Sequence, residues 1–226
     1  MSNLYIVATP IGNLEDISQR ALRILSEVDL ILCEDTRVTK KLLGRFGIKT
    51  PTLSYHQHSQ MKKTEDILQF LKGGKSLALV SDAGTPGISD PGNKLIATII
   101  ERGETSINSI KIVPVPGPSA VTAAASVAGF PMGKFVFLGF PPAKKKRKKF
   151  FEEVVSSKHP VIFYESPYRI IKSLTELRTL DDKLEVVVCR ELTKKFETIY
   201  RGNITQVVEQ LEKEEIRGEF VIAVKR

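Results

Sequence analysis

The chain has 226 residues, of which 42% are hydrophobic and 27% charged, a composition typical of a folded domain and not of a disordered chain. Its first residues lack a basic region and a long apolar run, so we expect no signal peptide and no membrane span, and a cytoplasmic protein. The net charge is +8, and it is uneven: residues 1–113 contain 14 Lys and Arg against 12 Asp and Glu, whereas residues 114–226 contain 20 against 14.

The first half alternates short apolar runs with helical periodicity. We expect strands at 4–8, 30–33, 76–80 and 110–113, and helices at 17–28, 37–46, 62–72 and 94–102. Asp16 or Asn13 is expected to cap the first helix. Strands that alternate with helices in this way indicate an α/β sheet.

The segment Val113-Pro-Val-Pro-Gly-Pro118 is the predicted boundary between two domains, residues 1–113 and 114–226. Proline and glycine at this density end the first α/β run and favour a rigid connection over a flexible linker. Beyond it the alternation resumes, with a helix at 119–128, strands near 135–138, 161–164, 184–189, 196–200 and 220–224, and helices near 144–156, 167–179 and 203–214. The sequence therefore predicts two α/β lobes.

The loop Ser81-Asp-Ala-Gly-Thr-Pro-Gly-Ile-Ser-Asp-Pro-Gly92 follows a predicted strand. Its glycines allow positive φ or close backbone approach, and its prolines fix φ, so the loop has a defined shape. Loops at the carboxyl ends of strands are where open α/β sheets bind small molecules. The alternative is a turn-rich connection. If this is a ligand site, Gly84→Val is expected to block binding while folding stays largely intact.

Other polar loops also follow predicted strands, at 9–13, 33–37, 164–169 and 190–195. Each alone fits a polar turn, but parallel strands would bring them to one edge of each sheet. The chain contains no G-x-x-x-x-G-K-[ST], G-x-G-x-x-G or G-x-S-x-G sequence, which argues against phosphoryl transfer, hydride transfer and a serine nucleophile.

Cysteine and histidine give little chemistry. Cys33 and Cys189 lie in or at the end of apolar runs and are expected to be buried free thiols. His56, His58 and His159 lack Cys or carboxylate partners at metal-ligand spacing, so we expect no metal site.

Six segments together resemble the ribosomal RNA methyltransferases of the tetrapyrrole methylase superfamily, in order and over essentially the whole chain: Leu4–Leu14, Glu34–Arg37, Leu79–Pro86, Val115–Ala120, Phe163–Ser166 and Arg190–Lys194. The resemblance implies S-adenosylmethionine as methyl donor, held in a cleft between the two α/β lobes. It implies the 2′-hydroxyl of a cytidine in the decoding region of 16S rRNA as acceptor, and a homodimer.

Carried over position by position, the resemblance implies that the donor is bound by residues from both lobes. These are Pro10, Gly12, Asp82, Ala83, Gly84, Ile88, Ser119, Ala120, Tyr164, Leu192 and Gly218. The matches at 82–84 and 119–120 are the most distinctive.

A ribose 2′-hydroxyl is a weak nucleophile, so a nearby group should accept its proton. The acidic candidates in the segments that carry the resemblance are Glu34, Asp35, Glu165 and Glu191. Arg37, Arg190 and Lys194 are candidates for orienting phosphates or stabilising the developing alkoxide. We name Glu191, Arg37 and Glu34 as the catalytic candidates. The alternative for Arg37 and Arg190 is a structural ion pair with these acids.

The basic run Lys144, Lys145, Lys146, Arg147, Lys148 and Lys149 precedes Phe150 and Phe151. Lysine and arginine supply affinity for RNA phosphates, and positive charge at the start of a helix opposes the helix dipole. We therefore predict that the run binds rRNA, the alternative being a solvated helix start.

Two other functions fit the resemblance less well. Methylation of a tetrapyrrole or a protein acceptor does not call for the basic run. A non-catalytic ribosome-binding factor does not call for intact donor loops.

Overall fold

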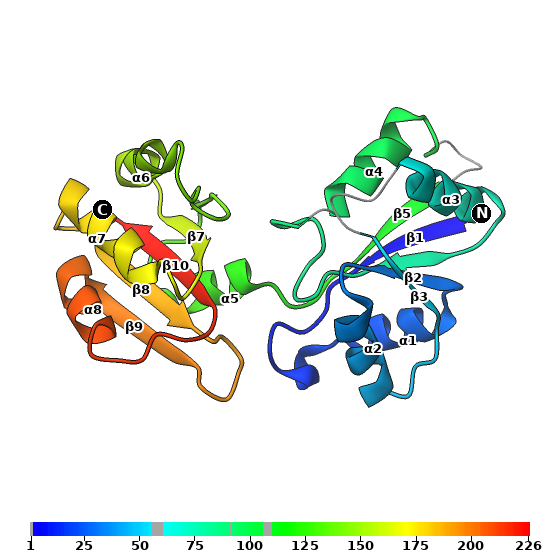
Figure 1. Cartoon of the computed structure of the whole chain (residues 1–226), viewed down its shortest axis with the longest axis horizontal. Coiled ribbons are helices and arrows are strands. Elements are labelled where there is room, and N and C mark those ends of the chain that lie inside the picture. Colours follow the sequence, from blue (N-terminus) through cyan, green and yellow to red (C-terminus); the bar gives the residue numbers. More distant parts are fainter. Residues whose placement is uncertain (1, 56–60, 91, 106–109) are drawn as a thin grey trace. The chain divides into compact units, whose positions relative to one another are not determined.

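The computed structural model describes residues 2–55, 61–90, 92–105 and 110–226, and the chain divides into two units, Met1–Ser119 and Ala120–Arg226. Figure 1 labels most of their helices and strands. Within the described part of the chain, none of the helices is long and apolar enough to cross a membrane.

The first unit is a β/α alternation around one parallel sheet. Its strands are β1 (Ser2–Val7), β2 (Leu30–Cys33), β3 (Thr52–Ser54), β4 (Leu77–Leu79) and β5 (Ile110–Val115). Its helices are the 3₁₀ turn η1 (Leu14–Asp16), α1 (Gln19–Glu27), α2 (Thr36–Arg45), α3 (Met61–Lys72) and α4 (Gly92–Glu101). The strand order is β3-β2-β4-β1-β5, and every pair is parallel. The segments that follow β1, β2, β4 and β5 therefore leave the sheet at the same edge.

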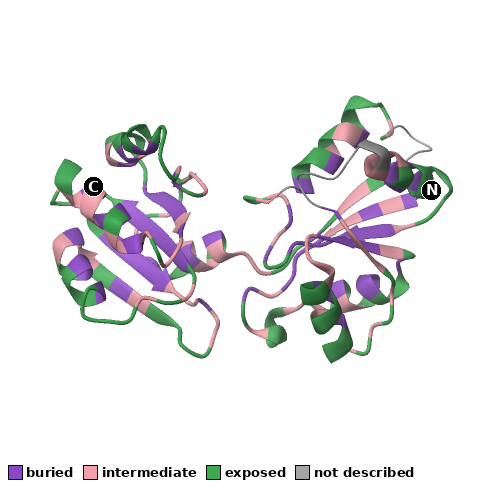
Figure 2. Cartoon of the chain, in the orientation of Figure 1, coloured by how far each residue is buried: buried purple, intermediate pink, exposed green. Residues whose placement is uncertain are grey.

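Helices cover both faces of this sheet, as the near-continuous apolar strands require. On one face Leu4, Leu32 and Leu77 pack with apolar side chains of α3 and α4. On the other, Ile31 and Val80 pack with α1 and α2. Figure 2 shows the buried residues concentrated in the central strands.

The second unit is built on a mixed sheet. Its strands are β6 (Val136–Phe137), β7 (Val161–Glu165), β8 (Glu185–Arg190), β9 (Thr198–Asn203) and β10 (Phe220–Lys225). Its helices are α5 (Ala120–Val127), α6 (Arg147–Ser156), α7 (Ile170–Leu180) and α8 (Ile204–Leu211). A single apolar cluster joins the sheet to α6, α7 and α8, with Phe151, Phe163 and Phe220 among its largest fully buried side chains.

The strand order of the second sheet is β6-β7-β10-β8-β9. β10 runs antiparallel to both β7 and β8, so β7 and β8 point the same way, and β6 is parallel to β7. The carboxyl ends of β6, β7 and β8 consequently lie at one edge, together with the residues that precede β10.

The alternation of strands and helices predicted from the sequence is confirmed, with local differences. β3 was not predicted, because three residues after Pro51 carry too little periodicity. Ser18, not Asp16 or Asn13, caps α1 by accepting from Ala21 N, and Asn13 caps η1 instead. β5 runs through Pro114, which is tolerated because β5 is an edge strand.

Candidate functional site

The loops after β1 and β4 are joined by main-chain hydrogen bonds at the carboxyl edge of the first sheet. Thr9 N donates to Gly84 O (2.9 Å) and Gly84 N donates to Thr9 O (3.0 Å). The Thr9 hydroxyl also donates to Ser81 O (3.3 Å). The predicted donor residues Pro10 and Gly12 are thus held beside the 81–92 loop.

The segment after β5 packs against the same two loops. The Thr85 hydroxyl donates to Pro118 O (3.0 Å), and a Cβ at Gly117 would lie 3.0 Å from Ala8 Cβ. Ser119, the next predicted donor residue, follows Pro118 directly. Three loops that are far apart in sequence therefore form one fixed main-chain surface.

The 81–92 loop is held in shape by one carboxylate. Asp90 accepts hydrogen bonds from Gly87 N (2.7 and 2.8 Å) and Gly92 N (2.8 Å). Asn93 Nδ2 donates to Gly87 O (2.6 Å). Asp82, Ala83 and Ile88, all predicted to contact the donor, are exposed on this braced loop, so the prediction of a shaped loop is confirmed.

Gly84 has φ +82°, a conformation that side-chain-bearing residues rarely adopt, and it is buried. A Cβ there would meet Ile11 Cγ2 at 3.4 Å and Pro118 O at 3.8 Å. Valine would therefore strain the backbone and crowd Ile11 within the protein itself. The positive φ of Gly84 therefore argues against the expectation that Gly84→Val leaves folding largely intact.

Carboxylates gather where β2 and β4 end. Asp35 N donates to Asp82 Oδ1 (3.1 Å). Burial raises the pKa of Glu34 above 4.5, and the negative charges of Asp82 and Asp90 raise it further. Glu34 is consequently a stronger base than an exposed glutamate, and the site as a whole favours a cation.

Arg37 is paired with its neighbour Asp35. Its Nη2 lies 2.6 Å from Asp35 Oδ2, and its Nε donates to both carboxylate oxygens at 3.1 Å. These bonds lower the pKa of Asp35 to about 2. Arg37 is nonetheless exposed, so its guanidinium remains accessible to a phosphate.

In the second unit Tyr164 is half-buried near the start of α5. Its ring packs against Phe137 (5.0 Å between centroids) and Phe140 (5.2 Å). Burial raises the pKa of its hydroxyl to about 12, opposed in part by a hydrogen bond from the Val121 backbone. Tyr164 therefore stays neutral at physiological pH and lies close to Ala120, another predicted donor residue.

The loop after β8 is tied to the residues before β10. Glu191 Oε1 accepts from Lys194 Nζ (2.8 Å) and Glu219 N (2.9 Å), and Lys194 Nζ also lies 3.0 Å from Glu219 Oε2. Burial works to raise the pKa of Glu191, but the hydrogen bonds outweigh it and the pKa is lowered. Gly218 must be glycine here, because a Cβ would lie 2.5 Å from Glu191 Cγ.

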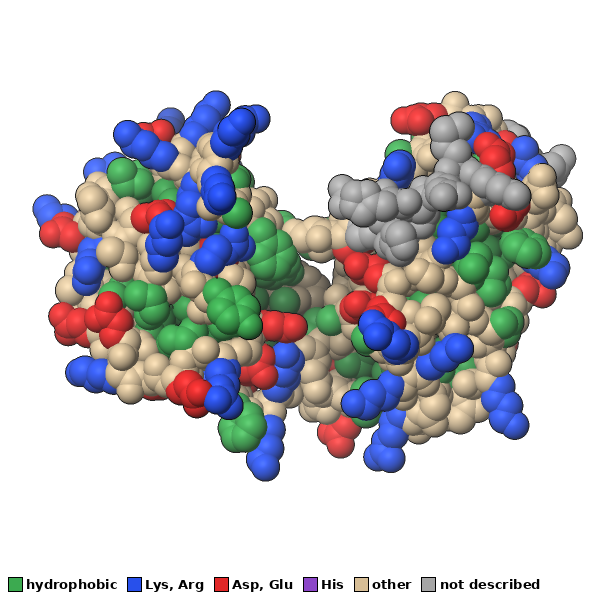
Figure 3. All heavy atoms as spheres, in the orientation of Figure 1, with side chains coloured by type: hydrophobic (Ala, Val, Ile, Leu, Met, Phe, Trp, Pro, Cys, Tyr) green, Lys and Arg blue, Asp and Glu red, His purple; other side chains and the backbone are tan. Residues whose placement is uncertain are grey.

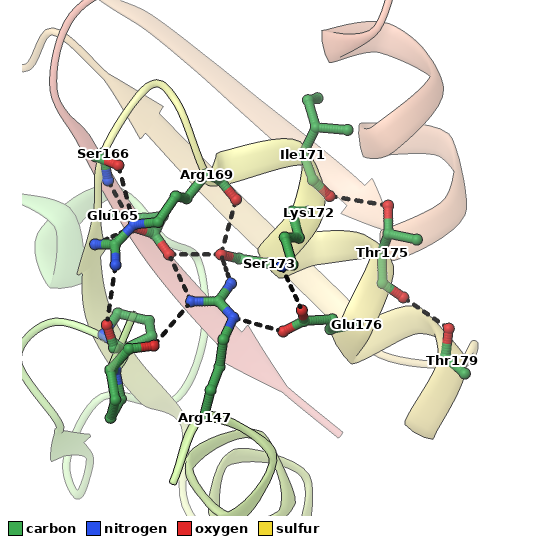
Figure 4. A network of polar contacts seen from close by, with 12 residues as sticks. Arg147, Glu165, Ser166, Arg169, Ile171, Lys172, Ser173, Thr175, Glu176 and Thr179 are labelled. Carbon is green, nitrogen blue, oxygen red and sulfur yellow. Dashed lines mark hydrogen bonds and ion pairs between the residues drawn. The ribbon is translucent and has the colours of Figure 1, made fainter. Parts of the chain in front are cut away.

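Glu165 and Arg147 form a buried network with residues of α7 (Figure 4). The Glu165 side chain is 0% exposed and lies 2.9 Å from Arg169 Nη2 and 3.7 Å from Arg147 Nη1. Ser173 donates to Glu165 Oε2 (2.5 Å). Glu165 is therefore an internal counter-ion, and the suggestion that it accepts the substrate proton is withdrawn.

Arg147 is the one member of the basic run that faces inward. Its side chain is 7% exposed, with Nε donating to Glu176 (2.8 Å) and Nη2 to Ser173 (2.7 Å). The prediction that Arg147 binds RNA is corrected on this ground. The aromatic neighbours are also internal, because Phe151 is buried and Phe150 packs edge-on against Phe163 (5.7 Å).

The five lysines of the run are exposed, and Lys and Arg side chains gather over α6 (Figure 3). α6 begins at Arg147, later than predicted, because Lys146 has φ +66° at its N-cap. Lys144, Lys145 and Lys146 therefore form a turn before the helix.

Arg190 serves the fold of the second unit. Its guanidinium donates to Arg217 O (2.9 Å), Glu215 O (3.1 Å) and Glu214 Oε2 (3.1 Å). These bonds fasten the end of β8 to the segment that leads into β10. The structural alternative for Arg190 is thus the one that the geometry supports.

Sequence reasoning missed two supporting residues. Asp90 was not singled out within the loop, although an aspartate two residues before a glycine is a typical acceptor for nearby main-chain N–H groups. Glu219 was not singled out, because nothing local in the sequence indicates its contact with Lys194.

Cys33 and Cys189 are buried free thiols, as predicted, and burial raises the pKa of Cys189 to about 11. Across the residues that the structure describes, no group of three or more His, Cys, Asp or Glu side chains is arranged to hold a metal ion. His56 and His58 lie outside the described residues.

Comparisons with known proteins all find similarity to methylases. The family described as Tetrapyrrole (Corrin/Porphyrin) Methylases matches residues 3–208. The ribosomal RNA small subunit methyltransferase I of Thermotoga maritima is 42% identical over 99% of this chain and 98% of its own length. The protein of that name from Vibrio cholerae is 47% identical over 98% of this chain and 76% of its own length.

Solved structures share the fold at low sequence identity. A diphthine synthase matches with a TM-score of 0.74 at 13% identity, covering 99% of this chain and 90% of that one. A cobalt precorrin-4 methyltransferase matches with a TM-score of 0.70 at 19% identity, covering 98% and 94%.

Proposed function

The chain belongs to the tetrapyrrole (corrin/porphyrin) methylase family, and we propose that it methylates the 2′-hydroxyl of a cytidine in 16S rRNA, using S-adenosylmethionine. It is a methyltransferase, like the ribosomal RNA small subunit methyltransferase I proteins to which it is similar over nearly its whole length. The observation that carries the proposal is the braced main-chain surface formed by the loops after β1, β4 and β5.

The residues at this edge fit the proposed donor. S-adenosylmethionine carries a positive sulfonium, and the edge holds the carboxylates Glu34, Asp82 and Asp90 close enough for two of them to raise the pKa of the third. A cation bound beside them would relieve that repulsion. Exposed Gly12 and Ala83 leave the backbone accessible to a ligand. In the second unit, Tyr164, Leu192 and Gly218 are retained as proposed donor-binding residues.

The donor supplies an electrophilic methyl group, so the protein has mainly to align the acceptor oxygen and to take up its proton. Among the candidates, Glu34 suits the proton acceptor because its pKa is raised, whereas Glu191 is already bonded to Lys194 and has a lowered pKa. We assign Arg37, which is exposed three residues after Glu34, to the phosphate next to the target ribose.

Labelled donor tests the reaction directly. The protein is incubated with small ribosomal subunits from cells that lack the modification, and the label is mapped by nuclease digestion and mass spectrometry. We expect label on the 2′-oxygen of one cytidine. Label on a base or on a protein would contradict the 2′-O assignment, and an absence of donor binding in calorimetry would favour a non-catalytic ribosome-binding factor.

We further propose that the lysines before and within α6 contact rRNA phosphates. Their exposure and their concentration on one short segment support this proposal. Replacing Lys144, Lys145, Lys146 and Lys149 by alanine should lower the salt-dependence slope of rRNA binding by about 0.7–0.9 per lost contact. Donor affinity should hold. The matched control replaces four exposed lysines of the first unit, Lys40, Lys41, Lys94 and Lys111, and an equal effect there would show that only total charge matters.

Homodimer formation and a cytoplasmic location complete the proposal. The family resemblance supports the first, and a ribosomal substrate supports the second. Sedimentation of the purified protein tests the oligomeric state.

A further inference from the structure

The loop between β8 and β9 carries an exposed aromatic side chain that the proposed reaction does not use. Phe196 is 68% exposed. The ammonium group of its neighbour Lys195 lies 5.6 Å from the centroid of the Phe196 ring. Exposure of a phenylalanine to this extent leaves most of its apolar surface in water, which marks it as a candidate contact with another molecule.

The loop that presents Phe196 is held in a fixed and strained form. Glu191 and Thr193 are non-glycine residues at φ +52° and +65°, which a β-branched residue such as Thr193 rarely adopts. Thr193 N donates to Glu197 Oε2 (2.6 Å), and Lys194 bridges Glu191 and Glu219. Such strain persists where surrounding contacts impose it, and it is concentrated at functional sites.

Three exposed aromatic residues follow strands whose carboxyl ends lie at one edge of the second sheet. Among the described residues, the most exposed are Tyr168 (96%), Phe196 and Phe140 (53%). They follow β7, β8 and β6, whose carboxyl ends lie at the same edge. Leu192 and Gly218, two of the proposed donor-binding residues, lie at that edge as well. The exposed rings are therefore on the side of the unit where the proposed chemistry would occur.

The net charge of the second unit favours a polyanionic partner, and a cation lies beside the exposed ring. Residues 114–226 carry 20 Lys and Arg against 14 Asp and Glu, and Lys195 is exposed beside the ring. A rigid aromatic ring next to a cation is how proteins hold unpaired nucleotides, with the base stacked on the ring and the phosphate on the cation.

We propose that Phe196 is a stacking platform for an unpaired base of the RNA substrate, with Lys195 contacting an adjacent phosphate. The proposal rests on the RNA methyltransferase function and adds a binding site to it. The base is held by its face, so the contact positions the RNA strand and does not read its sequence.

Alanine substitution tests the platform. Phe196→Ala should weaken the binding of unmodified small ribosomal subunits by about 5- to 150-fold, the usual cost of losing one base–aromatic stack. Phe196→Tyr should retain binding, and donor affinity should be unchanged in both. The matched control is Phe70→Ala. Phe70 is 39% exposed and its ring centroid lies 5.1 Å from Lys75 Nζ. It is near the end of α3, however, away from the carboxyl ends of the strands of the first sheet.

A tryptophan probe reports stacking itself. The chain contains no tryptophan, so Phe196→Trp places the only indole on the proposed platform. Purified 16S rRNA should quench its fluorescence, and the quenching should saturate at the same RNA concentration as binding. Phe70→Trp should not be quenched in this way.

Unchanged affinity of Phe196→Ala for small subunits would overturn the proposal, as would an unquenched indole in the bound complex. Sedimentation of Phe196→Ala tests the alternative that Phe196 packs against a second copy of the chain. In that case the variant would sediment as a smaller species than the wild type. These outcomes are read from binding and not from turnover. Failure of the wild type to methylate small subunits would instead contradict the proposed function.

Discussion

In the first unit the proposed functional edge is built from main chain, whereas in the second the corresponding edge is cross-linked by charged side chains. The loops after β1 and β4 pair through Thr9 and Gly84, and the 81–92 loop closes on the carboxylate of Asp90. The second unit relies on Glu165 with two arginines, and on Lys194 between Glu191 and Glu219.

The difference follows from sheet topology. A parallel sheet brings the ends of its strands, and the backbone that leaves them, to one edge without further support. In the mixed sheet β10 runs antiparallel to β7 and β8, so the amino end of β10 lies at the edge where β7 and β8 end. Gly218 and Glu219, which precede β10, therefore lie at that edge. Ion pairs then connect segments that the topology places together but does not join. Substitutions should therefore affect stability most in the second unit and donor binding most in the first.

The strongest test of this contrast is Glu165→Ala. Among the residues that the structure describes, the substitution leaves buried Arg147 with Glu176 as its one ionic partner, and breaking a buried pair in this way costs about 3 kcal/mol. Urea unfolding of the second unit should report this loss, with the first unit unaffected.

The matched control for Glu165→Ala is Glu152→Ala. Glu152 pairs with Lys148 at 3.8 Å on the exposed face of α6, and an exposed pair contributes at most about 1 kcal/mol. Equal effects of the two substitutions would mean that burial of the network contributes little to the stability of the second unit.

Asp90→Ala should act on binding in the first unit. Without the Asp90 carboxylate, Gly87 N and Gly92 N lose a charged hydrogen-bond acceptor. If this loss destabilises only the loop conformation that binds the donor, it costs about 1.5–3 kcal/mol of binding free energy. We therefore expect donor affinity to fall about 10- to 150-fold in calorimetry. Asp66→Ala, at an exposed position on α3, is the control. Full donor affinity in Asp90→Ala would mean that the loop keeps its shape by its glycines and prolines alone.

The same contrast decides how much the sequence could predict. Apolar runs, helical periodicity and Pro/Gly punctuation were enough for the α/β alternation, and loops placed after strands were enough to bring the first edge together. Both signals are local. The shape of the 81–92 loop was predictable for this reason, since glycine permits positive φ, and proline fixes its own φ and restricts the residue before it.

Long-range ion pairs have no such local signal. Arg147 lies among five lysines in the sequence. Only the fold shows that its side chain turns inward to Glu165 and Glu176 while the five lysines stay exposed. Glu165 was likewise a candidate proton acceptor, because it follows the predicted strand at 161–164. Burial of both side chains, which the sequence did not indicate, assigns them to the fold.

A pH series on Glu34→Gln tests the first edge at smaller scale. Burial and the charges of Asp82 and Asp90 raise the folded-state pKa of Glu34 above 4.5, so as pH rises the unfolded chain ionises first and stability is lost. Glutamine removes that loss. Unfolding midpoints of variant and wild type should coincide below pH 4.5 and diverge above it, the variant being the more stable. The methylation rate should nevertheless fall if Glu34 accepts the proton.

The smallest expected change is a shift in one titration. Hydrogen bonds from Arg37 lower the pKa of Asp35 to about 2, and Arg37→Ala should return it towards 3.8, as measured by carboxyl NMR. The stability that this pair contributes is present above 3.8 and lost as pH falls towards 2, and it should be slight because Arg37 is exposed and solvent screens the pair. Arg37 does not contribute to the raised pKa of Glu34, so Glu34 should titrate as before. If both carboxyl groups moved together, the edge of the first unit would be an interlinked charge network like that of the second, and the contrast between the units would fail where their side chains are most accessible.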